Sequence, residues 1–400
     1  MRPRRATSVA ELRQTDVKPA LLRRPRHVVV KMGSSLLAGP GGLDPAALAR
    51  LATDIAAVHA RDIDVTVVSS GAIAAGRTIL GGAAPKTIPE RQATASVGQI
   101  QLMAEWQKAF AAHGIVVAQI LLDADDLANR GRYLNAEHAL ATLHARRALP
   151  IVNENDTVSV DELKFGDNDN LSALVASLVG ADLLVILSDV GGLHTANPAT
   201  DAGARRIPVL ERIDGATLDL ASGGNALGTG GMRSKLLAAK KAAAAGIAAV
   251  IADGRAAGTL ADVLDARGDV GTLVLPLADR LARRKHWIAF TVKPKGTLRC
   301  DAGAVAAVSE RGRSLLPSGV VEVSGRFESG DCVRLLGPDG QEFARGLVSY
   351  RATEAARIAG RKSGEVEQIL GYKMGDAIVH RDDLVITVAD GSGRAEVRSA

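Results

Sequence analysis

The chain contains few aromatic residues and few cysteines. Phe, Trp and Tyr together make up 2% of its 400 residues, and Cys300 and Cys332 are its two cysteines. Two cysteines in a chain of this length are typical of the reducing cytoplasm, without a disulfide, and they form no metal-binding pattern. The eight histidines lack the spacing of a metalloprotease zinc site. The sequence therefore offers no candidate metal ligand.

Long apolar runs are also missing. No run reaches the roughly 18 residues that a membrane-spanning helix needs, so we expect no membrane partner. The first 26 residues are basic but lack the apolar core of a secretory signal. We expect a flexible extension over residues 1–26, with an organelle transit peptide as the alternative. The net charge of +5 is small for this length and does not by itself indicate nucleic acid. These absences favour a cytoplasmic enzyme.

The chain is rich in apolar residues, which make up 47% of it. Stretches of strand length alternate with stretches of helical length, which favours an α/β fold with a mostly parallel sheet. We expect strands at 27–31, 64–69, 115–122, 149–152, 181–187 and 247–252, the last strand of this domain. We expect helices at 44–61, from 72 onward, at 90–113 with a break or a kink near Gly98, and at 134–147, 171–179 and 236–245. From residue 291, short strands and turns predict a small β-rich second domain.

Polar side chains gather next to two of these expected strands. Asn153 and Asp156 follow one strand, and the pair Ser188-Asp189 ends the next. Between them lies the turn 166–170, which contains two carboxylates and two amides and precedes a helix. In open α/β sheets, ligands bind beyond the carboxyl ends of the strands. The alternative is a solvated turn whose Asp169 or Asn170 only caps the helix.

Lys31 lies at the carboxyl end of the first strand, beside a Gly-Ser turn. Such a lysine can reach a phosphate while backbone N–H groups of the turn hold it, although the spacing matches neither the P-loop nor the dinucleotide fingerprint. A lysine that merely extends to water is the alternative. The turn Ser69–Gly71 precedes a helix and suits a carboxylate, unless its serine is an ordinary cap.

The stretch 222–235 is rich in glycine and leads into a helix with Lys235 in its first turn. This arrangement suits a flap over nucleotide phosphates, and a surface loop is the alternative. Between the polar clusters, the alternation over residues 156–165 suggests a small hairpin over the site.

Five motifs in this order resemble the amino acid kinase family, and within it the glutamate 5-kinases of proline biosynthesis. They are Val30–Ser35, Ser69–Gly76, Val152–Asp156, Gly166–Leu174 and Gly228–Lys235. The segments 303–317, 371–372 and 380–383 resemble the PUA domain of many bacterial members. The resemblance implies a three-layer sandwich with a mostly parallel central sheet plus a small β-rich PUA-like domain. The expected parts are a kinase domain at 27–255, a linker at 256–290, a PUA-like domain at 291–390 and a flexible tail at 391–400.

The resemblance also implies an activity, ATP-dependent phosphorylation of the γ-carboxylate of L-glutamate. The implied catalytic residues are Lys31, Lys235 and Asp169, with Asp169 orienting the two lysines. The implied substrate-binding residues are Ser70, Asn153, Asp156 and Asn168. The implied ATP-binding residues are Lys31, Ser188, Asp189, Thr229, Gly230, Gly231, Met232, Arg233, Ser234 and Lys235. Mg²⁺ would accompany ATP and keep several waters, so we expect few protein ligands for it. Feedback inhibition by proline is implied too, and we expect a homo-oligomer, a dimer or a tetramer.

Two alternatives remain open. The first is a kinase for N-acetylglutamate, aspartate or carbamate, although the Asp156 carboxylate argues against an N-acylated substrate because it suits a free ammonium group. The second is an RNA-binding protein that acts through its PUA-like domain. That domain carries basic residues such as Arg311 and Arg313 but no aromatic platform for stacking bases.

Overall fold

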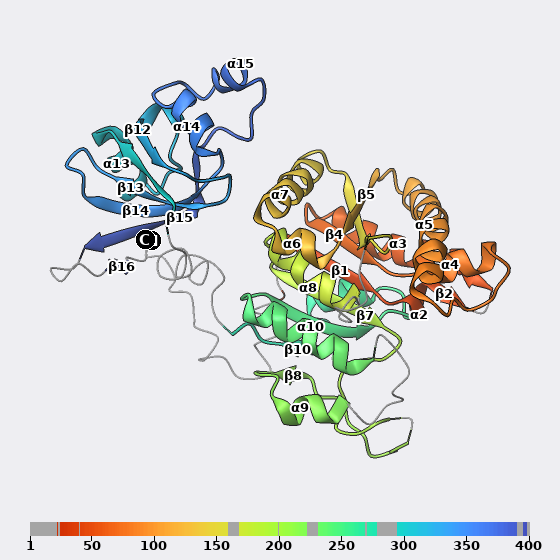
Figure 1. The fold of residues 1–400 in the computed structure, drawn as a ribbon. Coiled ribbons are helices and arrows are strands. Elements are labelled where there is room, and N and C mark those ends of the chain that lie inside the picture. Colours follow the sequence, from red (N-terminus) through yellow and green to blue (C-terminus); the bar gives the residue numbers. More distant parts are fainter. Residues whose placement is uncertain are drawn as a thin grey trace. The chain divides into compact units, whose positions relative to one another are not determined.

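The computed structural model describes residues 22, 25–39, 41–158, 168–198, 200–221, 231–268, 270–277, 294–389 and 395–397. The chain divides into two compact units (Figure 1). The large unit comprises residues 1–127 and 139–277, and the small unit comprises residues 128–138 and 278–400. Among the described residues, no helix combines the length and the apolar character needed to cross a membrane.

The large unit contains an eight-stranded sheet in the order β5-β6-β4-β1-β7-β9-β10-β8. Its strands are β1 (His27–Met32), β4 (Asp64–Ser69), β5 (Val117–Leu122), β6 (Leu149–Glu154), β7 (Leu183–Ser188), β8 (Val209–Leu210), β9 (Ala248–Asp253) and β10 (Thr272–Val274). The first six strands of that order are parallel, and β10 runs antiparallel to β9. The predicted mostly parallel sheet is therefore confirmed. A two-stranded hairpin, β2 (Ala38–Gly39) with β3 (Gly42–Leu43), lies outside this sheet.

Helices connect these strands, as the alternating pattern predicted. They are α2 (Ser34–Leu37), α3 (Pro45–His59), α4 (Ala72–Ile79), α5 (Ile88–Ala111), α6 (Ala124–Ala128), α7 (Arg130–Ala145), α8 (Asn168–Leu178), α9 (Gly215–Leu220), α10 (Met232–Ala244) and α11 (Thr259–Asp265). The side chain of Asp44 accepts hydrogen bonds from two backbone N–H groups at the start of α3, and Pro45 occupies its first position. Thr87 and Glu90 form a capping box at the start of α5.

The two faces of the sheet carry different helices. In β1, Val28, Val30 and Met32 join the core cluster that also contains residues of α3, α5 and α11. Because side chains of a strand alternate between faces, Lys31 points to the other face. Helix α8 packs against β1 and lies beside α10 (Figure 1). The strand alternation thus turns one lysine toward the N-terminal parts of α8 and α10.

Of the predicted break or kink at Gly98, the break is wrong, because α5 is one continuous helix of 24 residues. Gly98 serves a packing role instead. A Cβ atom at Gly98 would lie 1.8 Å from the carbonyl oxygen of Ala72 in α4, and one at Gly76 would lie 1.9 Å from the carbonyl oxygen of Thr94. The two glycines therefore let the backbones of α4 and α5 touch.

The sheet also continues beyond the strand that we expected to be its last. β10 pairs with β9, and β8 pairs with β10, so the prediction of a final strand at 247–252 is wrong. The segment 256–277, which was expected to begin a linker, contains α11 and β10. Helix α11 packs against α3, which places this segment in the large unit.

The small unit contains a six-stranded sheet in the order β12-β11-β13-β14-β15-β16, which confirms the predicted β-rich domain. Its elements are β11 (Gly296–Cys300), α13 (Ala302–Ser309), a 3₁₀ turn (Pro317–Gly319), β12 (Val320–Gly325), β13 (Cys332–Leu336), β14 (Glu342–Val348), α14 (Ala352–Ile358), α15 (Val366–Leu370), β15 (Val379–Ala389) and β16 (Ala395–Val397). Cys300 and Cys332 are buried and free. Burial raises the pKa of these thiols to about 12 and about 11, so neither is a reactive thiolate at neutral pH.

The close crossing of α4 and α5 predicts the effect of a single methyl group. Gly98→Ala should lower the free energy of unfolding by about 3 kcal/mol, because the new Cβ meets backbone that must shift. Gly215→Ala is the matched control, since Gly215 is also helical but has open space around it, and it should change stability by less than about 1 kcal/mol. Urea unfolding measures both values. Equal midpoints for Gly98→Ala and the wild type would contradict the close approach.

Candidate active site

The predicted site residues lie where four parallel strands end. β1 is central, with β4 on one side and β7 on the other, and β6 lies beyond β4. The next three strands of this sheet along the chain, β4, β5 and β6, lie on one side of β1, whereas β7 and β9 lie on the opposite side. Ligands of open α/β sheets bind beyond the carboxyl ends of the strands where the order reverses in this way. That rule places a ligand site at the carboxyl ends of β1, β4 and β7.

Lys31, Asp169 and Lys235 form one buried charge cluster. The Nζ atom of Lys31 forms an ion pair with Oδ1 of Asp169, and Nζ of Lys235 lies 3.6 Å from Oδ2. The exposed fractions of the three residues are 2%, 0% and 5%. The hydroxyl of Ser234 donates a hydrogen bond of 2.7 Å to the same carboxylate. Two lysines from distant parts of the sequence thus share one counter-charge.

The electrostatics of this cluster favour an ionised Asp169. Burial opposes the charge of the carboxylate, but Lys31 and Lys235 outweigh burial and hold the pKa of Asp169 below its usual range. One carboxylate and two ammonium groups leave a net positive charge. Asp169 lies in the first turn of α8 and Lys235 in the first turn of α10. An anion that approaches this point meets both lysines and the positive ends of two helices.

The start of α8 differs from the prediction. The helix begins at Asn168, so Asp169 and Asn170 lie inside it and neither is its N-cap. Asp169 is turned toward the lysines, and its backbone carbonyl accepts a hydrogen bond of 2.6 Å from the hydroxyl of Ser172. Its carboxylate therefore holds buried cations rather than the end of the helix. The hairpin expected at 156–165 falls largely outside the described residues.

A second cluster consists of amides and a hydroxyl. Nδ2 of Asn168 donates to Oγ of Ser70 at 3.0 Å and to Oδ1 of Asn153 at 3.1 Å. Nδ2 of Asn153 donates to Oε1 of Gln99 in α5 at 2.7 Å. Gly71, which follows Ser70, has a φ of 113° that favours glycine and lets the chain turn into α4. Three of the predicted substrate-binding residues are thus in one network, and the sequence analysis missed Gln99.

Asp156 is half-buried near this network. Burial, together with the negative charge of Glu154, raises the pKa of Asp156 to about 6, while Arg91 in α5 acts in the opposite direction. A carboxylate with a raised pKa gains from a cation beside it. The surroundings of Asp156 therefore suit an ammonium group of a ligand.

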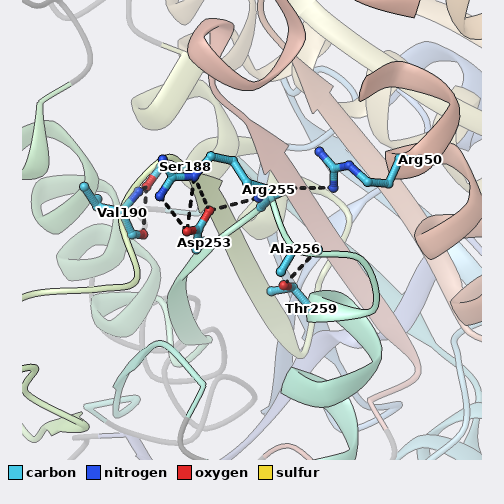
Figure 2. Close-up of polar contacts among 8 residues, drawn as sticks. Arg50, Ser188, Val190, Asp253, Arg255, Ala256 and Thr259 are labelled. Carbon is cyan, nitrogen blue, oxygen red and sulfur yellow. Dashed lines mark hydrogen bonds and ion pairs between the residues drawn. The ribbon is translucent and has the colours of Figure 1, made fainter. Parts of the chain in front are cut away.

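A third polar cluster joins the ends of β7 and β9 (Figure 2). The backbone N–H of Gly254 donates to the carbonyl of Ser188 at 2.8 Å, and Nη1 of Arg50 in α3 donates to the carbonyl of Gly254 at 2.7 Å. The guanidinium of Arg255 donates to the carboxylate of Asp253 at 2.7 to 3.2 Å. These contacts fix the loop after β9 beside the end of β7.

This third cluster contains residues that the sequence analysis passed over. The hydrogen bond from Arg255 holds the pKa of Asp253 below its usual range. Asp253 and, to a smaller extent, the negative charge of Asp189 raise the pKa of Arg255. The signal that selected Ser188 and Asp189, polar residues directly after a buried strand, applies to Asp253 and Arg255 as well. They were missed because the sequence analysis took 247–252 as the last strand of the domain and assigned no role to the polar residues that follow it.

The Gly-rich motif is described only from its end. Gly231 is the N-cap of α10, Met232 to Lys235 form its first turn, and the side chain of Arg233 is exposed. Thr229 and Gly230 lie outside the described residues. The described part brings Ser234 and Lys235 to Asp169, and thus connects this motif to the end of β1.

Comparison with known proteins covers both units. The model of the amino acid kinase family matches residues 26–253, and the model of the PUA domain matches residues 296–370. The chain is 52% identical to glutamate 5-kinase of Trichlorobacter lovleyi over 373 residues, which are 92% of this chain and 99% of that protein. It is 50% identical to glutamate 5-kinase of Geobacter sp. strain M21 over 377 residues, with 92% and 100% covered. Glutamate 5-kinase of Geobacter sulfurreducens is 49% identical over 373 residues, with 92% and 100% covered. The resemblance stated from the motifs is confirmed.

The buried charge cluster predicts a large loss of stability when its carboxylate is removed. Asp169→Asn leaves two buried ammonium groups without a counter-charge and should lower the free energy of unfolding by about 3–5 kcal/mol. Asp265→Asn, which removes partly exposed ion pairs to Arg61 and Arg267, should cost less than about 1 kcal/mol. Urea unfolding at pH 7 compares the two.

The pH dependence provides a check on the same effect. Because the folded pKa of Asp169 is lowered, its stabilisation is complete above the unfolded pKa of about 3.9 and is lost as the pH falls through the folded value. The stability difference between Asp169→Asn and the wild type should therefore shrink only in strong acid. A difference that disappears already at pH 6 would contradict the assigned charge state.

Proposed function

The chain belongs to the amino acid kinase family, and we propose that it transfers the γ-phosphoryl group of ATP to the γ-carboxylate of L-glutamate, the first step of proline biosynthesis. Relatives named glutamate 5-kinase align with it over 92% of its length and nearly all of theirs. The observation that carries the proposal is the pair of buried lysines on Asp169, directly beside the amide cluster of Ser70, Asn153 and Asn168.

The acceptor chemistry explains why two lysines are needed and a general base is not. A glutamate side chain has a pKa of about 4.3, so its γ-carboxylate is already ionised at neutral pH. The difficulty is to bring this anion against an anionic phosphoryl group. Lys31 and Lys235 supply positive charge where negative charge develops, in a site that excludes water. Asp169 holds the two ammonium groups in place.

The second cluster supplies the binding of the amino acid. Asp156 pairs with the α-ammonium group of glutamate, and Ser70, Asn153 and Asn168 surround the same end of the substrate. An N-acylated substrate has no ammonium group and would leave the half-buried Asp156 without a partner. This argument favours glutamate over N-acetylglutamate.

ATP lies on the side of β7 and β9 in this proposal. Ser188 and Asp189 meet the nucleotide, and Thr229, Gly230, Gly231, Met232, Arg233, Ser234 and Lys235 surround its phosphates. Support comes from the fixed loop after β9 and from the contact of Ser234 and Lys235 with Asp169. Arg255 adds an exposed positive charge on the same side.

Mg²⁺ accompanies ATP in this proposal and neutralises part of the phosphate charge. Among the described residues, no group of three His, Cys, Asp or Glu side chains could hold a metal ion. The Asp169 carboxylate is engaged by the two lysines and Ser234. This donor set fits a Mg²⁺ ion that is held mainly by phosphate oxygens and waters. Cytoplasmic location, feedback inhibition by proline and assembly into a homo-oligomer are further proposals that rest on the family resemblance.

The direct test is ADP release by the purified protein with Mg-ATP. Glutamate, N-acetylglutamate, aspartate and no acceptor are compared, with hydroxylamine present to trap an acyl phosphate. Glutamate-dependent ADP release with an equal amount of hydroxamate is the expected result. Turnover with a different acceptor only would overturn the substrate assignment, and no turnover with any acceptor would overturn the proposed activity.

The proposed role of Lys235 predicts that its substitution lowers kcat much more than it changes the KM for glutamate. Lys235→Ala should lower kcat by about a hundredfold or more, with a much smaller change in the KM for glutamate, because its contact strengthens in the transition state. Lys240→Ala is the control, since Lys240 is exposed on the same helix and should leave kcat unchanged. An unchanged kcat for Lys235→Ala would refute the role.

Asp156 predicts a pH dependence of glutamate binding. Its pKa of about 6 means that it is protonated at lower pH and loses its attraction for the ammonium group. The kcat/KM for glutamate should therefore fall as the pH drops below about 6, whereas Asp156→Asn should have a raised KM and lack this titration. The profile is measured from pH 5 to 8 with saturating ATP. The same titration in Asp156→Asn would assign it to another group.

A further inference from the structure

Gln99 in α5 presents a buried amide nitrogen that has no hydrogen-bond partner among the residues that the structure describes. The orientation of this amide follows from its neighbours. The backbone N–H of Glu154 donates to Oδ1 of Asn153 at 2.9 Å, so Nδ2 is the end of Asn153 that faces Gln99. A donor at 2.7 Å requires the acceptor Oε1 of Gln99 on that side. Nε2 of Gln99 is therefore the amide atom that points away from Asn153.

The same reasoning applies to Asn168. Its Nδ2 donates to both Ser70 and Asn153, so its Oδ1 remains, and within the described part of the chain that buried atom has no partner either. Ser70 accepts this hydrogen bond through its hydroxyl oxygen, which leaves its O–H group free to donate. Buried polar groups in folded proteins almost always have partners, so a free donor and a free acceptor in one network indicate a ligand that supplies both.

An α-amino acid carries such a pair on one carbon atom. Its ammonium group donates hydrogen bonds and its α-carboxylate accepts them. Oδ1 of Asn168 and the carboxylate of Asp156 suit the ammonium group, whereas Nε2 of Gln99 can only serve an acceptor. We propose that Gln99 is a substrate-binding residue whose Nε2 donates a hydrogen bond to the α-carboxylate of the amino acid substrate. This inference rests on the proposed function and adds a residue to its binding site.

The packing of α5 fixes Gln99 in this position. One turn earlier in the helix, Oγ of Ser96 lies 3.0 Å from Oγ1 of Thr157, so two successive turns of α5 contact the end of β6 and the residues that follow it. Gly98 lets the helix touch Ala72, which is two residues after Ser70. The close crossing of α4 and α5 therefore holds Gln99 at Asn153, at the end of β6, while the next helix residue toward the N-terminus lies against the start of α4.

The substitution Gln99→Glu tests the two polar atoms of this side chain separately. The variant keeps an acceptor for Asn153 but replaces the free N–H donor by a carboxylate oxygen that repels a substrate carboxylate. The KM for glutamate should rise about tenfold or more, while the KM for ATP stays within about twofold. Gln101→Glu makes the same change on the exposed face of the same helix, where Gln101 contacts Glu105, and should leave both constants unchanged.

The melting temperature separates binding from folding. If Gln99→Glu raised both KM values together and lowered the melting temperature, Gln99 would only support the fold, and the inference would be overturned. A KM for glutamate equal to that of Gln101→Glu would also overturn it. Wild-type protein without glutamate-dependent turnover would instead refute the proposed function itself.

A substrate analogue identifies the group that Gln99 contacts. The α-amide of glutamate replaces the α-carboxylate by a neutral group, and its binding is measured as the Ki for competition with glutamate. The wild type should prefer glutamate over the α-amide, and Gln99→Glu should reduce this preference about tenfold or more, because the amide can donate to the new carboxylate. An unchanged preference would show that Gln99 does not contact the α-carboxylate.

Discussion

The burial of two lysines that are far apart in the sequence of the large unit depends on a single carboxylate. Lys31 lies near the end of the central strand, Lys235 lies in the first turn of α10, and Asp169 lies between them with no exposed surface. A buried ammonium group is tolerated only beside a counter-charge, so the positions of β1, α8 and α10 are coupled through this contact. The cluster keeps a net positive charge. The same arrangement that allows the lysines to be buried therefore provides the charge that phosphoryl transfer requires.

The remaining parts of the site are fixed by backbone packing. The carboxyl ends of β4 and β6 place Ser70 and Asn153 on the side where we propose that the amino acid binds, and the ends of β7 and β9 place Ser188 and Asp253 on the side proposed for the nucleotide. Glycines let α4 and α5 touch, and this contact adds Gln99 to the amino acid side. In the proposed function, substrate and nucleotide thus meet over the central strand, where the two lysines lie.

Local sequence signals predicted much of the fold. They failed where a residue's structure depends on a contact with another helix or strand. The apolar strands and the cap of α3 at Asp44 follow from periodicity and capping chemistry, which act within a few residues. Gly98 was expected to break or kink a helix because glycine is a poor helix former. The helix continues through it, and the close approach of Ala72 in α4 leaves no room for a side chain at this position. The three residues of β10 were too short to be noticed, and they form a strand because β9 offers an open edge.

The sequence by itself determined the order of the motifs, the family and the residue types for phosphoryl transfer to a carboxylate. It also determined Lys31, Asp169 and Lys235, because the five motifs carry these residues in order. Only the tertiary structure decided that one carboxylate serves both lysines, that Asp156 has a raised pKa and that Gln99 is hydrogen-bonded to Asn153. The physical reason is that ion pairs, burial and hydrogen-bond partners arise between segments that are far apart in the chain, so no local pattern contains them.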